Sequence, residues 1–167
     1  QDIALQDAML FQSDGLPTLG ALGIEPTRMG NEFGFAAPAN VYDCLDGAVY
    51  LGVLLDDHWK ILAPIIGEAE LAEHPTFASR DERATNRDVC NMMVSEWAKP
   101  LPREQVLKTL QAAGLPAAPV NTFPEAAKDP HVQERDMLQP VEFTNGVTMP
   151  ITGPAAKFSR TPTKVRS

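Results

Sequence analysis

Two stretches of alternating apolar and polar residues carry hairpin signals. In "VYDCLDGAVYLGVL" (41–54), Asp46-Gly47 separates two alternating runs, and in "LQPVEFTNGVTMPI" (138–151) the same place is taken by Asn145-Gly146. Asp-Gly and Asn-Gly favour the tight turns that join antiparallel strands. The pattern therefore predicts two antiparallel hairpins, one near each end of the region from residue 39 to residue 162.

Helical periodicity begins after the first hairpin. Asp56 or Asp57 is a suitable N-cap, and Pro64 predicts a kink or an early stop. The apolar positions of this helix recur at helical intervals: Trp59, Leu62 and Ile66.

A second helical pattern opens at "SRDE", where Ser79 and Glu82 have the spacing of a capping box. It predicts one helix that ends before Pro100 and presents a single apolar face: Val89, Cys90, Met93, Val94 and Trp97. On this interpretation Trp97 is buried, and its truncation to Ala is expected to cost about 3–5 kcal/mol.

The remaining signals are short. A helix over 103–113 ends at Gly114, which suits a left-handed C′ position, and Pro116 prevents continuation. We expect short strands at "AAPVN" (117–121) and "AAKFS" (155–159), with helical turns between residues 124 and 137. Strands and helices mix without βαβ alternation, which predicts an α+β fold with a mainly antiparallel sheet and several short helices.

The first part of the chain is different. A short helix is expected over 2–12, but "GLPTLGALGIEPTRMGNEFG" (15–34) is rich in Gly and Pro and has no lasting period. We therefore expect residues 1–38 to end one domain and form a linker arm, residues 39–162 to form a small domain, and residues 163–167 to begin a return linker. Neither end carries a domain-closing element, so the sequence is interpreted as a fragment.

The composition disfavours several classes of partner and several cellular locations. Fourteen basic against 22 acidic side chains give a net charge of -8, which disfavours nucleic acid and anionic lipid as partners. No apolar run approaches the roughly 20 residues of a membrane span, and no signal peptide is visible. Cys44 and Cys90 lie in apolar periodic stretches, which favours free thiols in a cytoplasmic protein over a disulfide.

Candidate chemistry is sparse. His58, His74 and His131 are isolated, and neither cysteine has a partner at metal-ligand spacing, so no metal site is expected. Asp56 and Asp57 beside His58 fit an acid–base cluster less well than a helix N-terminus. No phosphate-binding loop or nucleophile motif occurs. The residues alone predict an α+β module without a self-contained active site.

The order of several stretches nevertheless resembles one family. These are "DIALQDAML" (2–10), "YDCLDGAVYLGV" (42–53), "GEAELAEHPTFASRDERATNRDV" (67–89), "LQAAGLPAAPVNTFPEAAKDPHVQERDML" (110–138) and "GPAAKFSRTP" (153–162). Together they resemble the family III CoA-transferases, which include formyl-CoA and carnitine CoA-transferases and the related α-methylacyl-CoA racemases. The run from Gly114 through Pro116, Val120 and Asn121 is the most specific part of the resemblance.

The resemblance implies a small domain that faces a large domain across a cleft holding acyl-CoA. Catalysis in the family uses an aspartate upstream of this sequence, which forms a CoA thioester, so the resemblance implies no catalytic residue in this chain. It further implies acyl-CoA and a carboxylic acid as substrates, no tightly bound cofactor, and an interlocked homodimer.

Two site expectations follow from the resemblance. The segment "NEFGFAAP" is expected to line the cleft, with ordinary interdomain wrapping as the alternative; its site residues are Asn31, Phe33, Gly34, Phe35, Ala36 and Pro38. A glutamate that supports the racemase histidine falls on Leu55, and an apolar residue there favours transferase over racemase. A non-catalytic interaction module of the same fold remains a further alternative, and the donor and acceptor acids are not specified.

Overall fold

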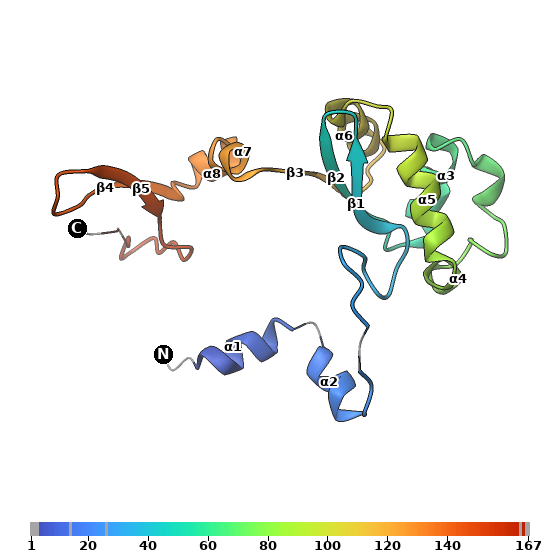
Figure 1. Ribbon diagram of the computed structural model, residues 1–167, viewed down its shortest axis with the longest axis horizontal. Helices are drawn as coiled ribbons and strands as arrows, with labels where there is room; N and C mark the ends of the chain where they lie inside the picture. The colour runs from blue at the N-terminus through green and yellow to red at the C-terminus, as the bar shows by residue number, and fades with distance from the viewer. Residues whose placement is uncertain (1–3, 14, 26, 164, 166–167) are drawn as a thin grey trace. The chain divides into compact units, whose positions relative to one another are not determined.

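The computed structural model describes residues 4–13, 15–25, 27–163 and 165, and confirms the α+β class (Figure 1). In chain order the elements are α1 (Leu5–Phe11), α2 (Leu16–Ala21), β1 (Ala39–Cys44), β2 (Gly47–Gly52), α3 (Asp56–Ile65), the 3-10 helix η1 (Ala69–Leu71), α4 (Arg80–Thr85), α5 (Arg87–Ala98), α6 (Arg103–Ala112), β3 (Ala117–Val120), α7 (Phe123–Ala127), α8 (Pro130–Glu134), β4 (Leu138–Glu142) and β5 (Thr148–Thr152).

The chain divides into two compact units, one formed by residues 1–41 and 51–94 and the other by residues 42–50 and 95–167. The first unit contains α1 to α4 and most of α5, and the second contains α6 to α8 and the β4–β5 hairpin. The proposed domain boundaries at residues 38 and 162 stay a prediction, and the proposed return linker lies partly outside the described residues.

Both predicted hairpins form. β1 and β2 are neighbours in a three-stranded sheet of order β1-β2-β3, and Leu45 and Asp46 make the turn between them. β4 pairs antiparallel with β5 in a register that sets Leu138 opposite Thr152. The strand expected over 117–121 forms as β3, but the last expected strand, over 155–159, is absent: these residues are irregular, and Pro154 just before them has no N–H to give to a strand ladder.

Helix α3 buries Trp59 and Leu62 of the predicted face together with Ala63, whereas Ile66 lies just beyond the helix and is half-buried. It begins one position earlier than expected from its caps. Leu55 occupies the N-cap without a side-chain hydrogen bond, while Asp56 and Asp57 lie in the first turn, where carboxylates interact favourably with the helix dipole. The prediction of an N-cap aspartate is therefore wrong.

The single helix expected after Ser79 is two helices. The Ser79 hydroxyl accepts a hydrogen bond from the Glu82 N–H, as expected for a cap, but α4 stops at Thr85 and α5 starts at Arg87. Between them, the Asn86 side chain donates to the Glu82 carbonyl at 2.9 Å, a local bond that competes with helix continuation.

Of the two tryptophans on predicted apolar faces, only Trp59 is fully buried. Trp97 is only half-buried and Val89 is exposed, whereas Trp59 is fully buried and donates from Nε1 to the Leu71 carbonyl at 3.0 Å. A second large side chain in the same core is charged: Arg83.

The second unit is built around α6, whose Val106 and Leu110 are buried. Gly114 follows the helix with a φ of 76°, as predicted, and the Leu115 N–H closes the end on the Leu110 carbonyl. α7 begins with a complete capping box between Thr122 and Glu125.

The arm holds α1 and α2, neither of which buries a residue. α1 lies inside the range expected for the first helix; residues 2 and 3 of that range are outside the described residues. α2 was not predicted, although Pro17 at its start is a position that favours helix initiation.

Candidate functional site

The segment expected to line a cleft divides into an exposed half and a buried half. Phe33 and Phe35 are exposed and meet edge to face with ring centroids 5.8 Å apart, while Ala36 and Pro38 are buried. Asn31 is exposed. The buried half is fixed by the backbone, because the Val53 N–H donates to the Pro38 carbonyl at 2.8 Å. The segment is thus an anchored loop that presents two aromatic rings.

The two rings lie on a hollow of about 430 Å³, here called the aromatic hollow. Its wall combines residues of the arm, the anchored loop and α5: Ser13, Leu16, Leu19, Thr27, Met29, Phe33, Gly34, Phe35 and Arg87. Of the six residues expected to line a cleft, the structure brings Phe33, Gly34 and Phe35 to this hollow and leaves Asn31, Ala36 and Pro38 outside its wall.

Arg87 brings a charge to this largely apolar wall. Its Nε donates to the Ala84 carbonyl at 3.0 Å, and its Nη1 lies 3.6 Å from the Met29 sulfur. The first bond holds the guanidinium in place, and the second is weak because a thioether is a poor acceptor.

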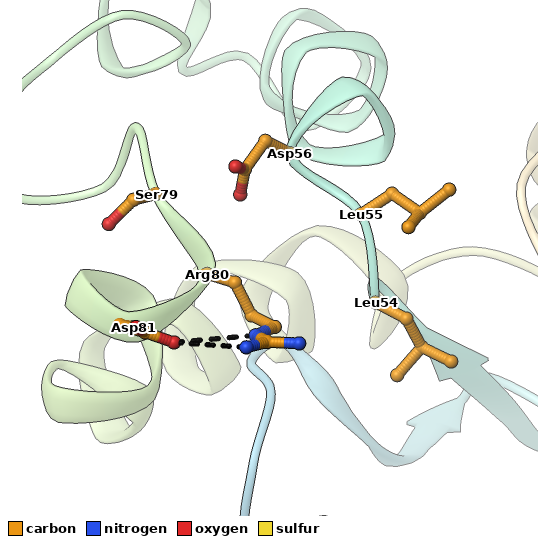
Figure 2. A pocket seen from close by; sticks show the side chains of 6 residues that line it. All are labelled: Leu54, Leu55, Asp56, Ser79, Arg80 and Asp81. Atoms are coloured by element: carbon orange, nitrogen blue, oxygen red, sulfur yellow. Dashed lines mark hydrogen bonds and ion pairs between the residues drawn. The ribbon is translucent and has the colours of Figure 1, made fainter.

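A second hollow, of about 260 Å³, lies where β2 runs into α3 and is here called the leucine hollow. Figure 2 shows Leu54 and Leu55 on the extended segment before α3, with Arg80 and Asp81 projecting from the start of α4. The wall is completed by Asp56 and Ser79. Arg80 pairs with its neighbour Asp81 at 3.3 Å, and both leucine side chains are largely exposed.

Arg83 ties the surroundings of both hollows together. It is fully buried, and its Nε donates to the Ala37 carbonyl at 3.0 Å, in the anchored loop. Its Nη1 donates to the carbonyls of Phe77 and Ala78 at 2.8 and 3.1 Å. Its Nη2 donates to Oδ1 of Asp56 at 3.0 Å, and the guanidinium stacks 5.7 Å from the Trp59 ring centre.

These contacts satisfy the cation in the interior, where an unpaired charge would be strongly destabilising. They also fix the anchored loop relative to the start of α3. Neither Arg83 nor Arg87 was found from the sequence, because an arginine in a polar helical segment normally points to solvent and no local pattern distinguishes these two.

The described residues offer binding surface rather than reactive groups. Among them no three His, Cys, Asp or Glu side chains are close enough to hold a metal ion. Asp56 lines the leucine hollow but is held by Arg83, and the Nδ1 atom of His58 is buried without a hydrogen-bond partner in this part of the chain. None of the helices that the structure describes has the length and apolar character of a membrane span.

Known proteins match this chain over most of its length. A family profile described as "CoA-transferase family III" matches residues 2–167. Succinyl-CoA:mesaconate CoA-transferase of Haloarcula marismortui is 31% identical over 141 residues, which are 83% of this chain and 35% of that protein. Acetyl-CoA:oxalate CoA-transferase of Acetobacter aceti is 30% identical over 150 residues, 89% of this chain and 38% of that protein.

Solved structures give the same result. The crystal structure of a CAIB/BAIF family protein from Brucella suis superposes with a TM-score of 0.74 at 28% identity, covering 90% of this chain and 38% of that one. The chain therefore spans less than half the length of each of these three relatives.

Proposed function

This chain belongs to CoA-transferase family III, and from that premise we propose that it is the small-domain part of an enzyme that moves CoA between carboxylic acids. The family match over residues 2–167 is the observation that carries the proposal. The two relatives described above are named as CoA-transferases, and their names contain the dicarboxylic groups succinyl, mesaconate and oxalate as well as the monocarboxylic group acetyl. We propose acyl-CoA and a carboxylic acid as the substrates of the enzyme to which this chain contributes.

In the proposed reaction, an aspartate outside this chain attacks the acyl-CoA carbonyl and expels CoA thiolate, giving a mixed anhydride. The thiolate then attacks the aspartyl carbonyl of the anhydride, which releases the donor acid and leaves an aspartyl-CoA thioester. The acceptor carboxylate repeats the two steps in reverse and leaves as the new acyl-CoA. Atoms and charges balance without a metal or redox cofactor.

The role of this chain in the proposed enzyme is to shape the cleft. The exposed Phe33, Phe35, Leu54 and Leu55 supply apolar surface beside the hollows, which supports a role in excluding water from a hydrolysis-prone anhydride. Arg83 supports a role in positioning, because it fixes the loop and the start of α3 from the interior. The large domain and the second subunit of a homodimer are partners that we propose from the family.

The racemase alternative is disfavoured by Leu55, whose side chain is exposed on the leucine hollow and has no group that can orient a histidine. A non-catalytic module of the same fold is the remaining alternative. It shares every feature of the two hollows, so only an activity measurement separates it from the transferase.

The test is a CoA-transfer assay on two samples, the native polypeptide isolated from source cells with an antibody to this segment, and the 167-residue chain alone. Each is incubated with a panel of acyl-CoA donors and mono- and dicarboxylic acceptors, and new acyl-CoA esters are quantified by chromatography. We expect transfer by the native polypeptide and none by the isolated chain. Transfer by the isolated chain would refute the location of the catalytic group, and no transfer by the native polypeptide would favour the non-catalytic module.

A further inference from the structure

The aromatic hollow has one cation in a largely apolar wall, and we propose that it binds the non-reacting carboxylate of a dicarboxylic substrate, with Arg87 as the group that contacts it. This inference rests on the proposed function for its biological role, although the binding site itself does not. It assigns a specificity-determining residue and selects dicarboxylic over monocarboxylic acids.

The guanidinium of Arg87 is available for a ligand. No carboxylate among the described residues lies within 4.0 Å of it, in contrast to Arg80, Arg83 and Arg103, which all have an acidic partner. Within the described part of the chain, the only hydrogen bond of Nη1 is to the Met29 sulfur, at 3.6 Å. A carboxylate is a far better acceptor than a thioether, so a ligand replaces this contact at little cost.

The apolar wall of the aromatic hollow strengthens an ion pair between Arg87 and a ligand carboxylate. Phe33, Phe35, Leu16 and Leu19 lie on the same wall, and low-polarity surroundings reduce the screening of a charge pair by water. The Nε bond to the Ala84 carbonyl fixes one edge of the guanidinium, which leaves the two terminal nitrogens to face a carboxylate in a bidentate arrangement.

The size of the hollow suits a small acid. At about 430 Å³ it falls within the roughly 300–1,000 Å³ of typical ligand pockets. Gly34 keeps the loop close to the sulfur: a Cβ on Gly34 would lie 3.3 Å from the Met29 Sδ, tighter than ordinary contact. The loop, Met29 and Arg87 therefore meet at one end of the hollow.

The chemistry of CoA transfer explains why two carboxylates are needed. One carboxyl carbon of the substrate forms the thioester and must sit at the reacting centre. A cation in the small domain can recognise only a second charge on the same molecule, because a monocarboxylic acid presents an alkyl chain at its other end. Arg87 thus favours dicarboxylic acids, and the aromatic wall accepts the carbon chain between the two groups.

The first test is calorimetric titration of the native polypeptide with succinate and with butyrate, two four-carbon acids that differ by one carboxylate. We expect succinate to bind at least about tenfold more tightly, as one charge-assisted pair provides. Arg87→Gln should abolish the preference, and Arg87→Lys should retain part of it because the charge remains but the planar fork is lost. Lys108→Gln, which removes an equally positive side chain from the exposed surface of α6, should behave as wild type.

A second variant keeps the test decisive if Arg87→Gln does not fold. Leu16 is half-exposed on α2, so Leu16→Asp places a carboxylate on the wall without disturbing the core, and this carboxylate competes with succinate for Arg87. We expect the succinate preference to be lost here as well. Equal binding of the two acids by wild type, or a preference that survives in both Arg87→Gln and Leu16→Asp, would overturn the inference.

Kinetics separate this inference from the proposed function. In wild type we expect transfer to succinate, with a KM that rises about tenfold in Arg87→Gln while kcat stays unchanged and transfer to butyrate is unaffected. If wild type transfers CoA to no acid, the proposed function fails, and the binding titration still decides whether the hollow recognises a dicarboxylate. An equal loss of activity toward both acids would contradict the specificity role of Arg87.

Discussion

Arg83 and Asp56 form a hydrogen-bonded ion pair of 3.0 Å between two very different environments. The Arg83 side chain is 0% exposed, whereas that of Asp56 is 52% exposed and lines the leucine hollow. The same guanidinium binds the Ala37 carbonyl, 46 residues away along the chain. The buried Arg83 guanidinium therefore contacts both the anchored loop beside the aromatic hollow and the start of α3 beside the leucine hollow.

Removal of this cation should destabilise the fold strongly. Arg83→Met leaves the buried carbonyls of Ala37 and Phe77 without their donor, and each buried acceptor left unsatisfied typically costs about 1–3 kcal/mol. Arg80→Met is the matched control, because Arg80 is exposed and pairs only with its neighbour; its cost should stay within about 0.5 kcal/mol. Denaturant titration of both variants measures the two free energies of unfolding. Equal, small effects would show that Arg83 is not the anchor described here.

Two glycines should respond oppositely to the same substitution. Gly114 has a φ of 76°, and a Cβ added to it would meet no atom within 4 Å, so Gly114→Ala should cost about 1 kcal/mol through backbone strain alone. Gly20 lies within α2 and also has open space, but without positive φ, so Gly20→Ala should leave the free energy of unfolding unchanged or raise it slightly. Thermal unfolding distinguishes the pair, and a destabilised Gly20→Ala variant would contradict the assignment of α2.

The two free thiols should differ in reactivity. Burial raises the pKa of Cys90 to about 11, and the side chain is fully shielded, so it should react with a thiol reagent only after unfolding. Cys44 is partly exposed, and its pKa is raised by burial and by Asp46 and Asp43, so it should react first but slowly. Timed alkylation followed by peptide mass spectrometry measures both rates; rapid labelling of Cys90 in the folded protein would be inconsistent with this core.

The raised pKa of Cys90 also makes the stability of the folded state depend on pH. The folded pKa lies above the ordinary value of 9.0, so the folded state holds the thiol proton more tightly. Its contribution to stability is complete below pH 9 and is lost as the pH rises toward 11. A Cys90→Ser variant has no thiol to ionise, so the difference in its unfolding profile over this range isolates the effect.

The Glu125 carboxylate should make the second unit sensitive to acid. A hydrogen bond from Arg103 at 2.7 Å, with those from Thr122, lowers the pKa of Glu125 to about 2. Because the folded pKa is below the ordinary value of 4.5, this contribution to stability is present above pH 4.5 and is lost as the pH falls toward 2. Comparison of wild type with Glu125→Gln by unfolding at several pH values should show a smaller acid dependence in the variant. If the free energy of unfolding depends on pH equally in wild type and Glu125→Gln, the Glu125–Arg103 pair does not contribute to stability.

Local signals identified the parts of the fold that depend on local chemistry. Asp46-Gly47 and Asn145-Gly146 located both hairpins because these residue pairs favour tight turns, although the turns themselves fall one residue earlier, at residues 45–46 and 144–145. Gly114 ended α6 where predicted, because a left-handed C′ residue needs only its own backbone freedom. The aromatic residues Phe33 and Phe35 were placed on a candidate surface only through a resemblance to a family.

The errors over Trp97 and Arg83 arise from the packing of the folded chain. Periodicity identified an apolar face on the helix that contains Trp97, but it does not report how deeply each side chain is buried: Trp97 is half-buried, whereas Trp59 is fully buried. Arg83 is polar by sequence and buried by structure, because its acceptors come from residues 37, 56, 77 and 78. Such convergence is a property of the folded chain and leaves no local pattern.

The central claim is that this chain shapes a CoA-transferase cleft whose covalent chemistry occurs on another part of the protein. The most direct measurement is peptide mass spectrometry of the native polypeptide after it is mixed with acyl-CoA and rapidly quenched. The account predicts a CoA thioester on an aspartate outside these 167 residues. A CoA adduct on Asp56 or on any other aspartate of this chain would contradict it.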